Sequence, residues 1–325
     1  MKIKLWGVRG SLPAPHPPHV LREKLVGLVD DFLQYQKRTG QSDIEQFMQS
    51  IEPHRVSGWG GNTACVEVHS SKQRLIIDGG SGIRPLGEKL MGGPCGVGRG
   101  EVHLLMTHFH WDHVIGLPFF VPIFVPGNKI HVYSVQDDAR EVFETVFKKP
   151  MFPVPFDRLG AEVIFHKLEP RKPKEFNDLK VTPYQLDHPD PCWGFKIEQG
   201  NKVFSYCVDT EGIRVSPADL GEDLPLYQNV DLMVFDAQYT FLEAAEKVDW
   251  GHSSAPVGLD LAVREGIKRI LFVHHDPAAS DDKVFEAQKQ TQDYFSARLK
   301  AAKAQNRVLT PVQWEFAREG MEIEL

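Results

Sequence analysis

The segment Thr107–His113 constrains this 325-residue chain most strongly, because it reads THFHWDH and places three histidines and one aspartate within six residues. It directly follows the apolar run Val102–Met106, which is typical of a strand covered on both faces. In an extended chain His108 and His110 lie on the same side, and the aspartate and third histidine follow at the turn into a helical segment. Neutral imidazole and carboxylate groups are ligands of zinc and similar divalent ions. Four such groups exceed what one ion takes from one short segment, so the motif predicts two adjacent metal ions.

Composition places the chain among ordinary soluble globular proteins, with 42% hydrophobic and 25% charged residues. A net charge of −7 argues against a strongly basic nucleic-acid surface. The four cysteines form no CxxC pair, and residues 1–7 alternate like a strand rather than an apolar signal core. The longest apolar run, at 117–125, is far short of the roughly 20 residues that span a bilayer. We therefore expect a cytoplasmic protein with reduced thiols and no membrane partner.

Strand-like runs alternate with helical segments along the whole length, which predicts a layered α/β fold. Strands are expected at 64–68, 74–77, 102–106, 203–208, 232–235 and 269–273, and helices at 256–265 and 283–302. At roughly 150 residues per domain the length allows two domains, but layered folds of this kind use it as one. We expect a single domain over residues 1–325.

Residues 13–53 form a polar stretch with helical periodicity, in which Leu21, Leu25, Leu28 and Phe32 recur near i, i+4 and i+7. We interpret it as a helical insertion between the first strand and the GWGGNT turn at 58–63. Its apolar stripe is expected to pack against the body; a cap over a site or a dimer contact is the alternative. The proline-rich stretches 117–127 and 143–156 are predicted to be either packed surface loops or the rim of a pocket.

The order of the ligand-type residues resembles the metallo-β-lactamase superfamily over most of the chain. After the H-x-H-x-D-H motif come His188 in a loop, Asp209 at the end of a strand, and His274 after the apolar run Ile270–Val273. The resemblance implies a four-layer αββα sandwich, with two metal ions at one edge between the sheets. Zinc suits the ligands, while manganese, iron, cobalt or nickel are alternatives for a mixed histidine and aspartate site.

The resemblance also assigns the ligands. One ion would be held by His108, His110 and His188, the other by Asp112, His113 and His274, with Asp209 bridging them. His274 is favoured over its neighbour because it follows the apolar strand immediately. His275 would then lie behind the ligands or at the surface.

A second set of signals is similar to the phosphodiesterase-like branch of that superfamily. The stretch Asp249–Ser254 reads DWGHSS and resembles the His-Ser/Thr element of ribonuclease Z and the phosphoribosyl cyclic phosphodiesterases. In that branch the histidine, here His252, contacts the scissile phosphate or the leaving group. Glycine-rich turns at 7–11, 60–63 and 78–84 also match, and such turns let backbone approach a ligand closely.

These signals predict a phosphodiesterase that hydrolyses a small or cyclic phosphodiester with a metal-bridging hydroxide. The expected catalytic residues are Asp112, Asp209 and His252, with His252 donating a proton or binding the phosphate. Weaker candidates for substrate contact are Arg9, Arg84 and Asp236, the last of which would orient His252.

Three other functions stay open at this point. The same site could hydrolyse a carbonyl ester, thioester or lactone. An RNA nuclease is less expected, because the chain is acidic and has no basic glycine-rich arm for transfer RNA. A metal-binding sensor without turnover would use the insertion and the aromatic loops for a partner. The branch resemblance also implies a homodimer.

Overall fold

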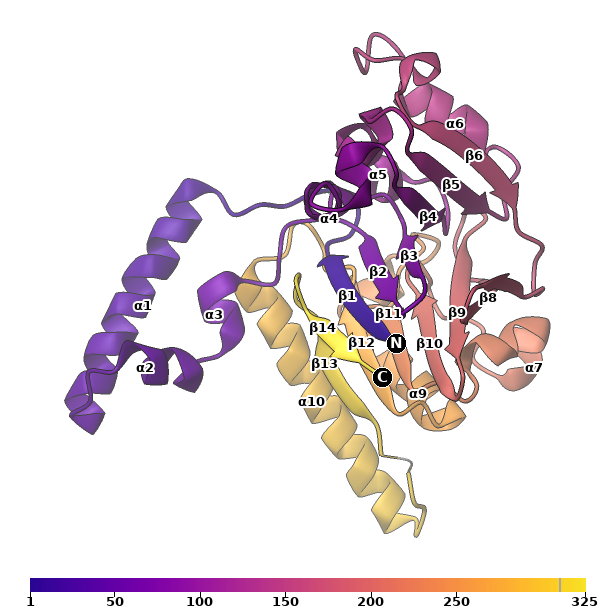
Figure 1. Ribbon diagram of the computed structural model, residues 1–325. Coiled ribbons are helices and arrows are strands. Elements are labelled where there is room, and N and C mark those ends of the chain that lie inside the picture. The colour runs from indigo at the N-terminus through magenta and orange to yellow at the C-terminus, as the bar shows by residue number, and fades with distance from the viewer. Residues whose placement is uncertain (310) are drawn as a thin grey trace.

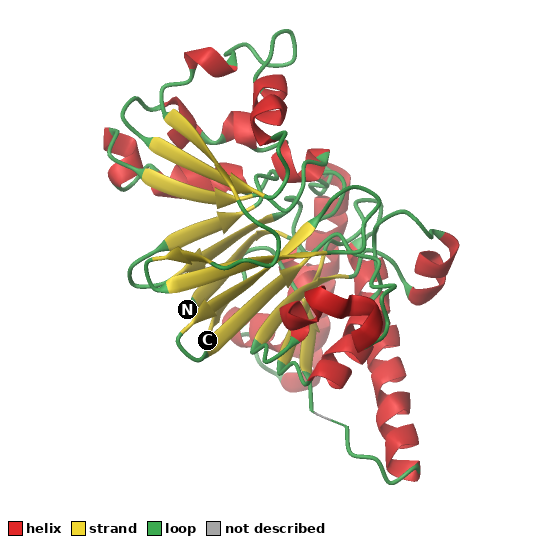
Figure 2. Cartoon of the chain, turned by 90° about the vertical axis from the view of Figure 1, so that its right-hand side faces the viewer, coloured by secondary structure: helices red, strands yellow, loops and turns green. Residues whose placement is uncertain are grey.

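Two seven-stranded sheets stack face to face in the computed structural model, which describes residues 1–309 and 311–325 (Figures 1 and 2). The first contains, in order across the sheet, β14 (Glu322–Glu324), β1 (Lys2–Gly7), β2 (Cys65–His69), β3 (Arg74–Ile77), β4 (Glu101–Leu105), β5 (Lys129–Ser134) and β6 (Glu162–Lys167). The second contains β13 (Gln313–Phe316), β12 (Arg269–Val273), β11 (Leu232–Asp236), β10 (Lys202–Cys207), β9 (Trp193–Gln199), β8 (Leu179–Gln185) and β7 (Lys174–Phe176).

Each sheet is half antiparallel and half parallel. Strands β14, β1, β2 and β3 pair antiparallel, as do β7, β8, β9 and β10. Strands β3 to β6 and β10 to β13 pair parallel. Parallel neighbours need long crossover connections, and these connections carry most of the helices.

The helices cover the outer faces of the sheets. Beside the first sheet lie α4 (Ile83–Leu90), α5 (Trp111–Val114) and α6 (Ala139–Val146), with the short turns η1 (Pro94–Val97), η2 (Leu117–Phe119), η3 (Val121–Phe124) and η4 (Phe156–Arg158). Beside the second lie α7 (Pro217–Leu220), η5 (Gly221–Tyr227), α8 (Phe241–Glu246), α9 (Ala255–Glu265) and α10 (Asp281–Ala304).

Three apolar cores bind these four layers together. The inter-sheet core contains Leu5, Phe195 and Phe204, and the outer cores form under α4 and α6 on one side and under α9 and α10 on the other. Successive strand residues face opposite sides, so Leu104 packs under the helices while Leu105 packs between the sheets. The predicted αββα sandwich is therefore confirmed, and every strand and helix predicted from periodicity is present within two residues of its expected ends.

The N-terminal insertion forms a helical arm that projects from the body (Figure 1). It consists of α1 (Pro18–Thr39), α2 (Ile44–Ser50) and α3 (Pro53–Ser57), and α1 ends at Gly40 in the left-handed conformation. The inner face of α1 packs on its own short helices, with Phe32 and Phe47 ring centroids 5.2 Å apart. The expectation that the whole stripe packs against the body is wrong, because Leu21 and Leu25 are exposed on the outer face.

The two proline-rich stretches differ in their packing. Residues 117–127 form η2 and η3, and they bury Leu117, Phe120 and Ile123 in the outer core. In the stretch 143–156 Phe143 is buried, whereas Met151 is exposed. Among the described residues, every helix is too short or too polar to cross a lipid bilayer.

The inter-sheet core predicts a large stability loss for Phe204→Ala, because this side chain is fully buried between the sheets. We expect a loss of about 3–5 kcal/mol in the free energy of unfolding, measured by chemical denaturation. The matched control is Leu242→Ala on α8, where the side chain is 74% exposed and a change within about 0.5 kcal/mol is expected. Equal losses in both variants would contradict this account of the core.

Candidate metal centre

The candidate ligands lie where strands end at one edge of the sandwich. His108 and His110 follow β4, His188 follows β8, Asp209 follows β10, and His274 follows β12. The helix α5 starts at Trp111 and so carries Asp112 and His113 on its first turn. The carboxyl ends of parallel strands lie at the same edge of a sheet and commonly carry sites in α/β folds.

Three residues at this edge adopt a backbone conformation that is uncommon outside glycine. Asp78, Asp209 and His274 have φ angles of 63°, 62° and 67°, and each is the first or second residue after its strand. The left-handed turn redirects the chain directly after the strand. Such conformations cost on the order of 1–3 kcal/mol and cluster at functional sites.

Three histidines form the first group of ligand-type side chains. One ring nitrogen from each of His108, His110 and His188 lies within 4.8 Å of the others. His188 Nε2 is 3.2 Å from His110 Nδ1, and the His108 ring centroid is 4.6 Å from that of His110. Three imidazoles at this spacing can hold one metal ion.

Hydrogen bonds fix the orientation of these rings. His188 Nδ1 lies 3.1 Å from the Gly251 carbonyl oxygen, and His110 Nε2 lies 2.8 Å from an oxygen of Asp190. The Thr107 hydroxyl is 3.1 Å from His108 Nδ1. Partners of this kind set which nitrogen of a metal-binding histidine remains free for the ion.

Two aspartates and two histidines form the second group, and all four are buried. His274 Nε2 is 3.0 Å from both Asp112 Oδ2 and Asp209 Oδ1, and His113 Nε2 is 2.5 Å from Asp209 Oδ2. Asp209 Oδ2 is also 3.3 Å from His108 Nε2. Asp209 therefore lies between the two groups, in the position that the sequence resemblance assigns to a bridging ligand.

Burial and charge act differently on the two groups. Burial lowers the pKa of His108 well below its usual value and also lowers that of His188, which favours neutral rings. Burial opposes the charged forms of Asp112 and Asp209 too, but the facing imidazoles overcome it and hold both pKa values well below normal. The same carboxylates overcome burial at His274 and raise its pKa to about 10.

Two buried carboxylates that face imidazole rings form a site suited to divalent metal ions. His108 Nε2, His113 Nε2 and both carboxylate oxygens of Asp209 are buried without a hydrogen-bond partner among the described residues. Unsatisfied buried polar atoms are costly, and here they converge on one place. Divalent cations would satisfy these atoms and compensate the two buried aspartates, with the imidazoles neutral.

Asp78 is a further candidate for the centre that the sequence did not single out. Its Oδ2 lies 2.8 Å from His113 Nδ1, and its Oδ1 accepts a hydrogen bond from the Thr107 backbone N–H. This carboxylate therefore orients a predicted ligand. The sequence showed Asp78 only as part of a glycine-rich turn. Its place directly after the apolar strand at 74–77 was the signal that could have identified it.

His252 lies beside the second group, with its ring centroid 4.8 Å from that of His274. Its Nδ1 is 2.9 Å from Asp236 Oδ2, while Asp236 Oδ1 accepts from the Ser253 backbone N–H. Asp236 also accepts from the Asp209 backbone N–H at 3.2 Å. Asp236 is fully buried, so its carboxylate faces His252 and the Asp209 loop and not solvent. This geometry suits the expected role of orienting His252.

The structure contradicts the prediction that Arg9 contacts substrate. Its side chain is only 2% exposed, and the guanidinium donates to the carbonyl oxygens of Gly60, Asp276 and Ala279. A guanidinium that ties three loop carbonyls together has no free face for a phosphate. Arg84 is exposed on α4, where it pairs with Glu88 at 2.7 Å.

His275 points away from the candidate ligands. Its Nε2 lies 2.8 Å from the Ala317 carbonyl oxygen, and its ring stacks on Phe316. Burial lowers the pKa of His275 to about 3, so the ring is neutral and donates to that carbonyl. The geometry therefore favours His274 as the ligand. His275 instead ties β12 to the N-terminal strand through its backbone N–H and the Val8 carbonyl.

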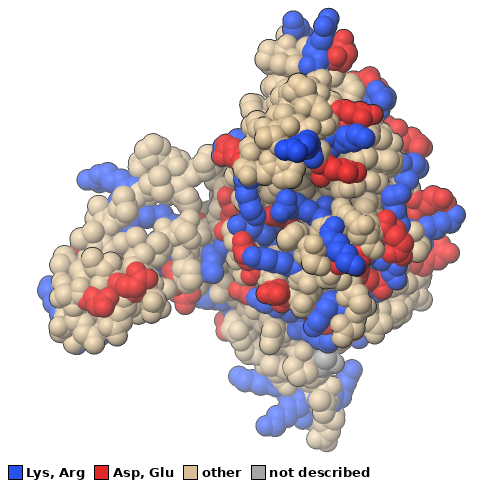
Figure 3. Space-filling view, in the orientation of Figure 1, with Lys and Arg blue, Asp and Glu red and all other residues tan. Residues whose placement is uncertain are grey.

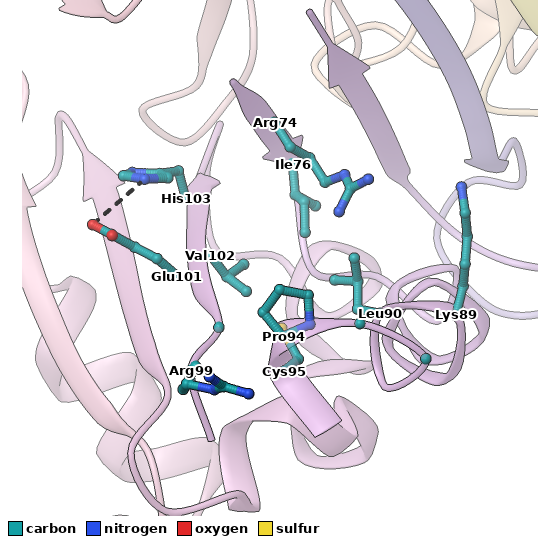
Figure 4. Close-up of a pocket in the computed structure, with 13 residues that line it drawn as sticks. Arg74, Ile76, Lys89, Leu90, Pro94, Cys95, Arg99, Glu101, Val102 and His103 are labelled. Atoms are coloured by element: carbon teal, nitrogen blue, oxygen red, sulfur yellow. Dashed lines mark ion pairs between the residues drawn. The ribbon is translucent and has the colours of Figure 1, made fainter. Parts of the chain in front are cut away.

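A cavity of about 420 Å³ lies at the other end of β4 (Figure 4). Arg74, Lys89 and Arg99 line it, and Glu101 at the start of the strand forms part of its wall. The predicted ligands follow Leu105 at the opposite end of this strand. The cavity is therefore separate from the candidate metal centre.

The family follows from comparison with known proteins. A family model described as a beta-lactamase superfamily domain matches residues 73–275, which is more than half of the chain. The chain therefore belongs to the beta-lactamase superfamily, as its motifs predict.

Individual relatives agree with this assignment. Ribonuclease Z of Ignicoccus hospitalis is 24% identical over 225 residues, covering 55% of this chain and 71% of the relative. Ribonuclease Z of Azobacteroides pseudotrichonymphae is 26% identical over 228 residues, with coverages of 58% and 74%.

Solved structures show the same fold over nearly the whole chain. YhfI from Bacillus subtilis, a metallo-beta-lactamase fold protein, has a TM-score of 0.58 and 16% identity, covering 99% of this chain and 98% of its own. A diphosphatase of the PhnP family has a TM-score of 0.60 and 16% identity, with coverages of 100% and 97%. At this identity the likeness establishes the fold alone.

The contact between Asp78 and His113 predicts that Asp78→Asn binds metal more weakly. We expect a loss of about 10–100-fold in metal affinity, because the ligand loses its orienting carboxylate. Competition with a chelator, followed by elemental analysis, measures it, and circular dichroism checks the fold. The control Asp219→Asn alters an exposed capping residue on α7 and should leave affinity unchanged. Unchanged affinity in Asp78→Asn would remove this residue from the centre.

Proposed function

We propose that the chain is a dinuclear metal-dependent phosphodiesterase acting on a small or cyclic phosphodiester. The observation that carries the proposal is the position of His252. It is held by Asp236 and lies beside two adjacent groups of ligand-type side chains that meet at Asp209. A histidine that is oriented by a carboxylate next to a metal centre suits phosphate binding or proton donation.

The proposed ligands keep the assignment made from the motifs. They are His108, His110 and His188 for one ion, Asp112, His113 and His274 for the other, and Asp209 between them. Zinc fits these ligands, and manganese, iron, cobalt and nickel are the alternatives. Two bound cations would supply a hydroxide nucleophile at neutral pH and offset the charge on the phosphate oxygens.

The protein's own groups would orient the reactants. Asp112 Oδ2 accepts a hydrogen bond from the Ser11 backbone N–H at 2.8 Å, which fixes this carboxylate beside His274. From there it would orient the attacking water. Asp236 Oδ2 would accept a hydrogen bond from His252 Nδ1–H. In the imidazolium form the Nε2–H is then left to bind a phosphate oxygen or to protonate the departing oxygen.

A cavity next to the first group offers room for a substrate. It has a volume of about 410 Å³, and its wall includes His188, Glu211, Ile213 and Asp249. Because His188 is a proposed ligand, a phosphodiester bound at the centre could extend one substituent into this cavity. The volume lies within the range of small-molecule sites, roughly 300–1,000 Å³.

The charge of the protein surface favours a small diester over a large RNA as the proposed substrate. On the face drawn in Figure 3, Lys and Arg side chains are interspersed with Asp and Glu, and the net charge of the chain is −7. Phosphate-rich polymers bind best to a continuous basic surface. The relatives named ribonuclease Z nevertheless make an RNA nuclease the second candidate.

The metal assignment predicts loss of both metal and activity in His110→Ala and Asp209→Ala. Each variant removes a proposed ligand from one or both ions, so we expect less bound metal and little hydrolysis of bis-p-nitrophenyl phosphate with added manganese or zinc. Elemental analysis and the assay measure both. Full activity and full metal content in both variants would refute the two-metal assignment.

His252→Ala is expected to keep the metal content and lose about 10²–10⁴-fold in kcat on the same diester. The control His19→Ala changes an exposed histidine on the arm and should keep wild-type turnover. A panel with thioesters, lactones and single-stranded RNA tests the alternatives. If His252→Ala hydrolyses the diester normally, while a carbonyl ester is the better substrate, the phosphate assignment is wrong.

A further inference from the structure

The outer face of α1 carries an apolar row without a partner. Leu21, Leu25, Val29 and Leu33 recur every four residues and are 48%, 63%, 58% and 47% exposed, and Val26 beside them is 49% exposed. We call these five residues the arm ridge. The opposite face of α1 packs on α2 and α3, so the ridge points away from both. Figures 1 and 3 show the arm projecting from the body.

The ridge is as large as the largest apolar patch found on typical monomeric proteins. From the exposed fractions, its apolar area is on the order of 400 Å², which equals the largest apolar patch of a typical monomer. The four-residue row runs about 18 Å along the helix at 1.5 Å per residue. Apolar patches of this size are often functional.

Ion pairs at the base of the arm hold the inner face of α1 toward the body. Asp281, at the start of α10, lies 2.7 Å from His16 Nε2 and 2.5 Å from Lys24 Nζ. Its other oxygen accepts from the Trp59 backbone N–H at 3.2 Å. The same carboxylate therefore connects the arm to the body on the inner face of α1, and the ridge remains on the outside.

We propose that the arm ridge packs against the arm ridge of a second copy of this chain, with the two α1 helices antiparallel. A two-fold contact uses the same surface on both subunits, so the surface must be complementary to itself. Helices that cross at about 20° pack rows of residues three apart into grooves between residues four apart, and this class gives a long contact along both helices. When the rows are centred on each other, Leu21 meets Leu33 of the partner subunit and Leu25 meets Val29 of the partner subunit.

The charges beside the ridge select the antiparallel direction. Arg22 and Asp30 are both exposed on the outer half of α1, whereas Lys24 and Asp31 are engaged on the inner side by Asp281 and Arg55. In the antiparallel arrangement Arg22 lies within one turn of Asp30 of the partner subunit. A parallel pair would place like charges opposite each other. Opposite charges beside an apolar row set partner orientation in helix pairs.

The apolar area that two arm ridges would bury is about half of the total area buried in a stable, specific interface. Together they offer on the order of 800 Å² of apolar area, against roughly 1,200–2,000 Å² in stable interfaces. The polar side chains that flank the ridges add the remainder as a rim. This dimer does not depend on the proposed phosphodiesterase activity.

Sedimentation velocity of the full chain over a range of concentrations tests the proposal. The wild type should form a dimer, and Leu25→Glu with Val29→Glu should weaken dimerisation at least about tenfold, since it buries like charges at the centre of the contact. The matched control Leu299→Glu changes an exposed leucine on α10 and should dimerise like wild type. Unchanged circular dichroism and metal content would show that both variants are folded.

A charge exchange tests the direction of the helices. Asp30→Arg should weaken the dimer severalfold, and adding Arg22→Asp in the same chain should restore it. A wild type that stays monomeric overturns the proposal, as does a ridge variant that dimerises normally. A monomer that binds anionic phospholipid vesicles through the ridge would assign this surface to a lipid instead. The ridge variant could lose dimer affinity while Arg22→Asp does not restore the affinity lost in Asp30→Arg. That result would overturn the antiparallel arrangement.

Discussion

The buried carboxylate of Asp209 is the constraint on which the candidate centre depends. It has no hydrogen-bond partner for either oxygen among the described residues, yet it lies within 3.3 Å of nitrogens from His108, His113 and His274. A buried carboxylate in this setting needs positive charge nearby. In the metal-free chain the raised pKa of His274 favours an imidazolium that provides it. Bound divalent cations would provide it instead, with the imidazoles neutral. Two aspartates and five histidines of the candidate centre lie together at this edge of the sandwich.

The scaffold meets this need through strand ends and sharp turns. Parallel halves of the two sheets bring β4, β10 and β12 to one edge, and the left-handed residues Asp209 and His274 redirect the chain there. The inter-sheet core holds these strands in place and so fixes the spacing of the ligands. Backbone strain at the edge is tolerated because buried packing and hydrogen bonds surround it. Orienting groups such as Asp78 and Asp236 then set each imidazole.

The arm stands apart from this arrangement. It is anchored at Asp281 and packs mainly on its own short helices. An apolar row at regular helical spacing is visible in the sequence, but periodicity does not say which body the row faces. The stripe contains two rows: Leu28 and Phe32 turn inward, whereas Leu21 and Leu25 turn outward. Only the placement of α2 and α3 separates them.

The sequence by itself determined the layered fold and the predicted ligand set. Apolar runs of strand length and the THFHWDH motif are local signals, and the order of later histidines and aspartates carries the family resemblance. Contacts between distant segments were decided only by tertiary structure. The Arg9 guanidinium donates hydrogen bonds to the carbonyl oxygens of Gly60 and Asp276. The Asp78 carboxylate, which follows a neighbouring strand, contacts the His113 ring. Such roles depend on which loops meet at the sheet edge, and that meeting is set by strand pairing and packing rather than by neighbours along the chain.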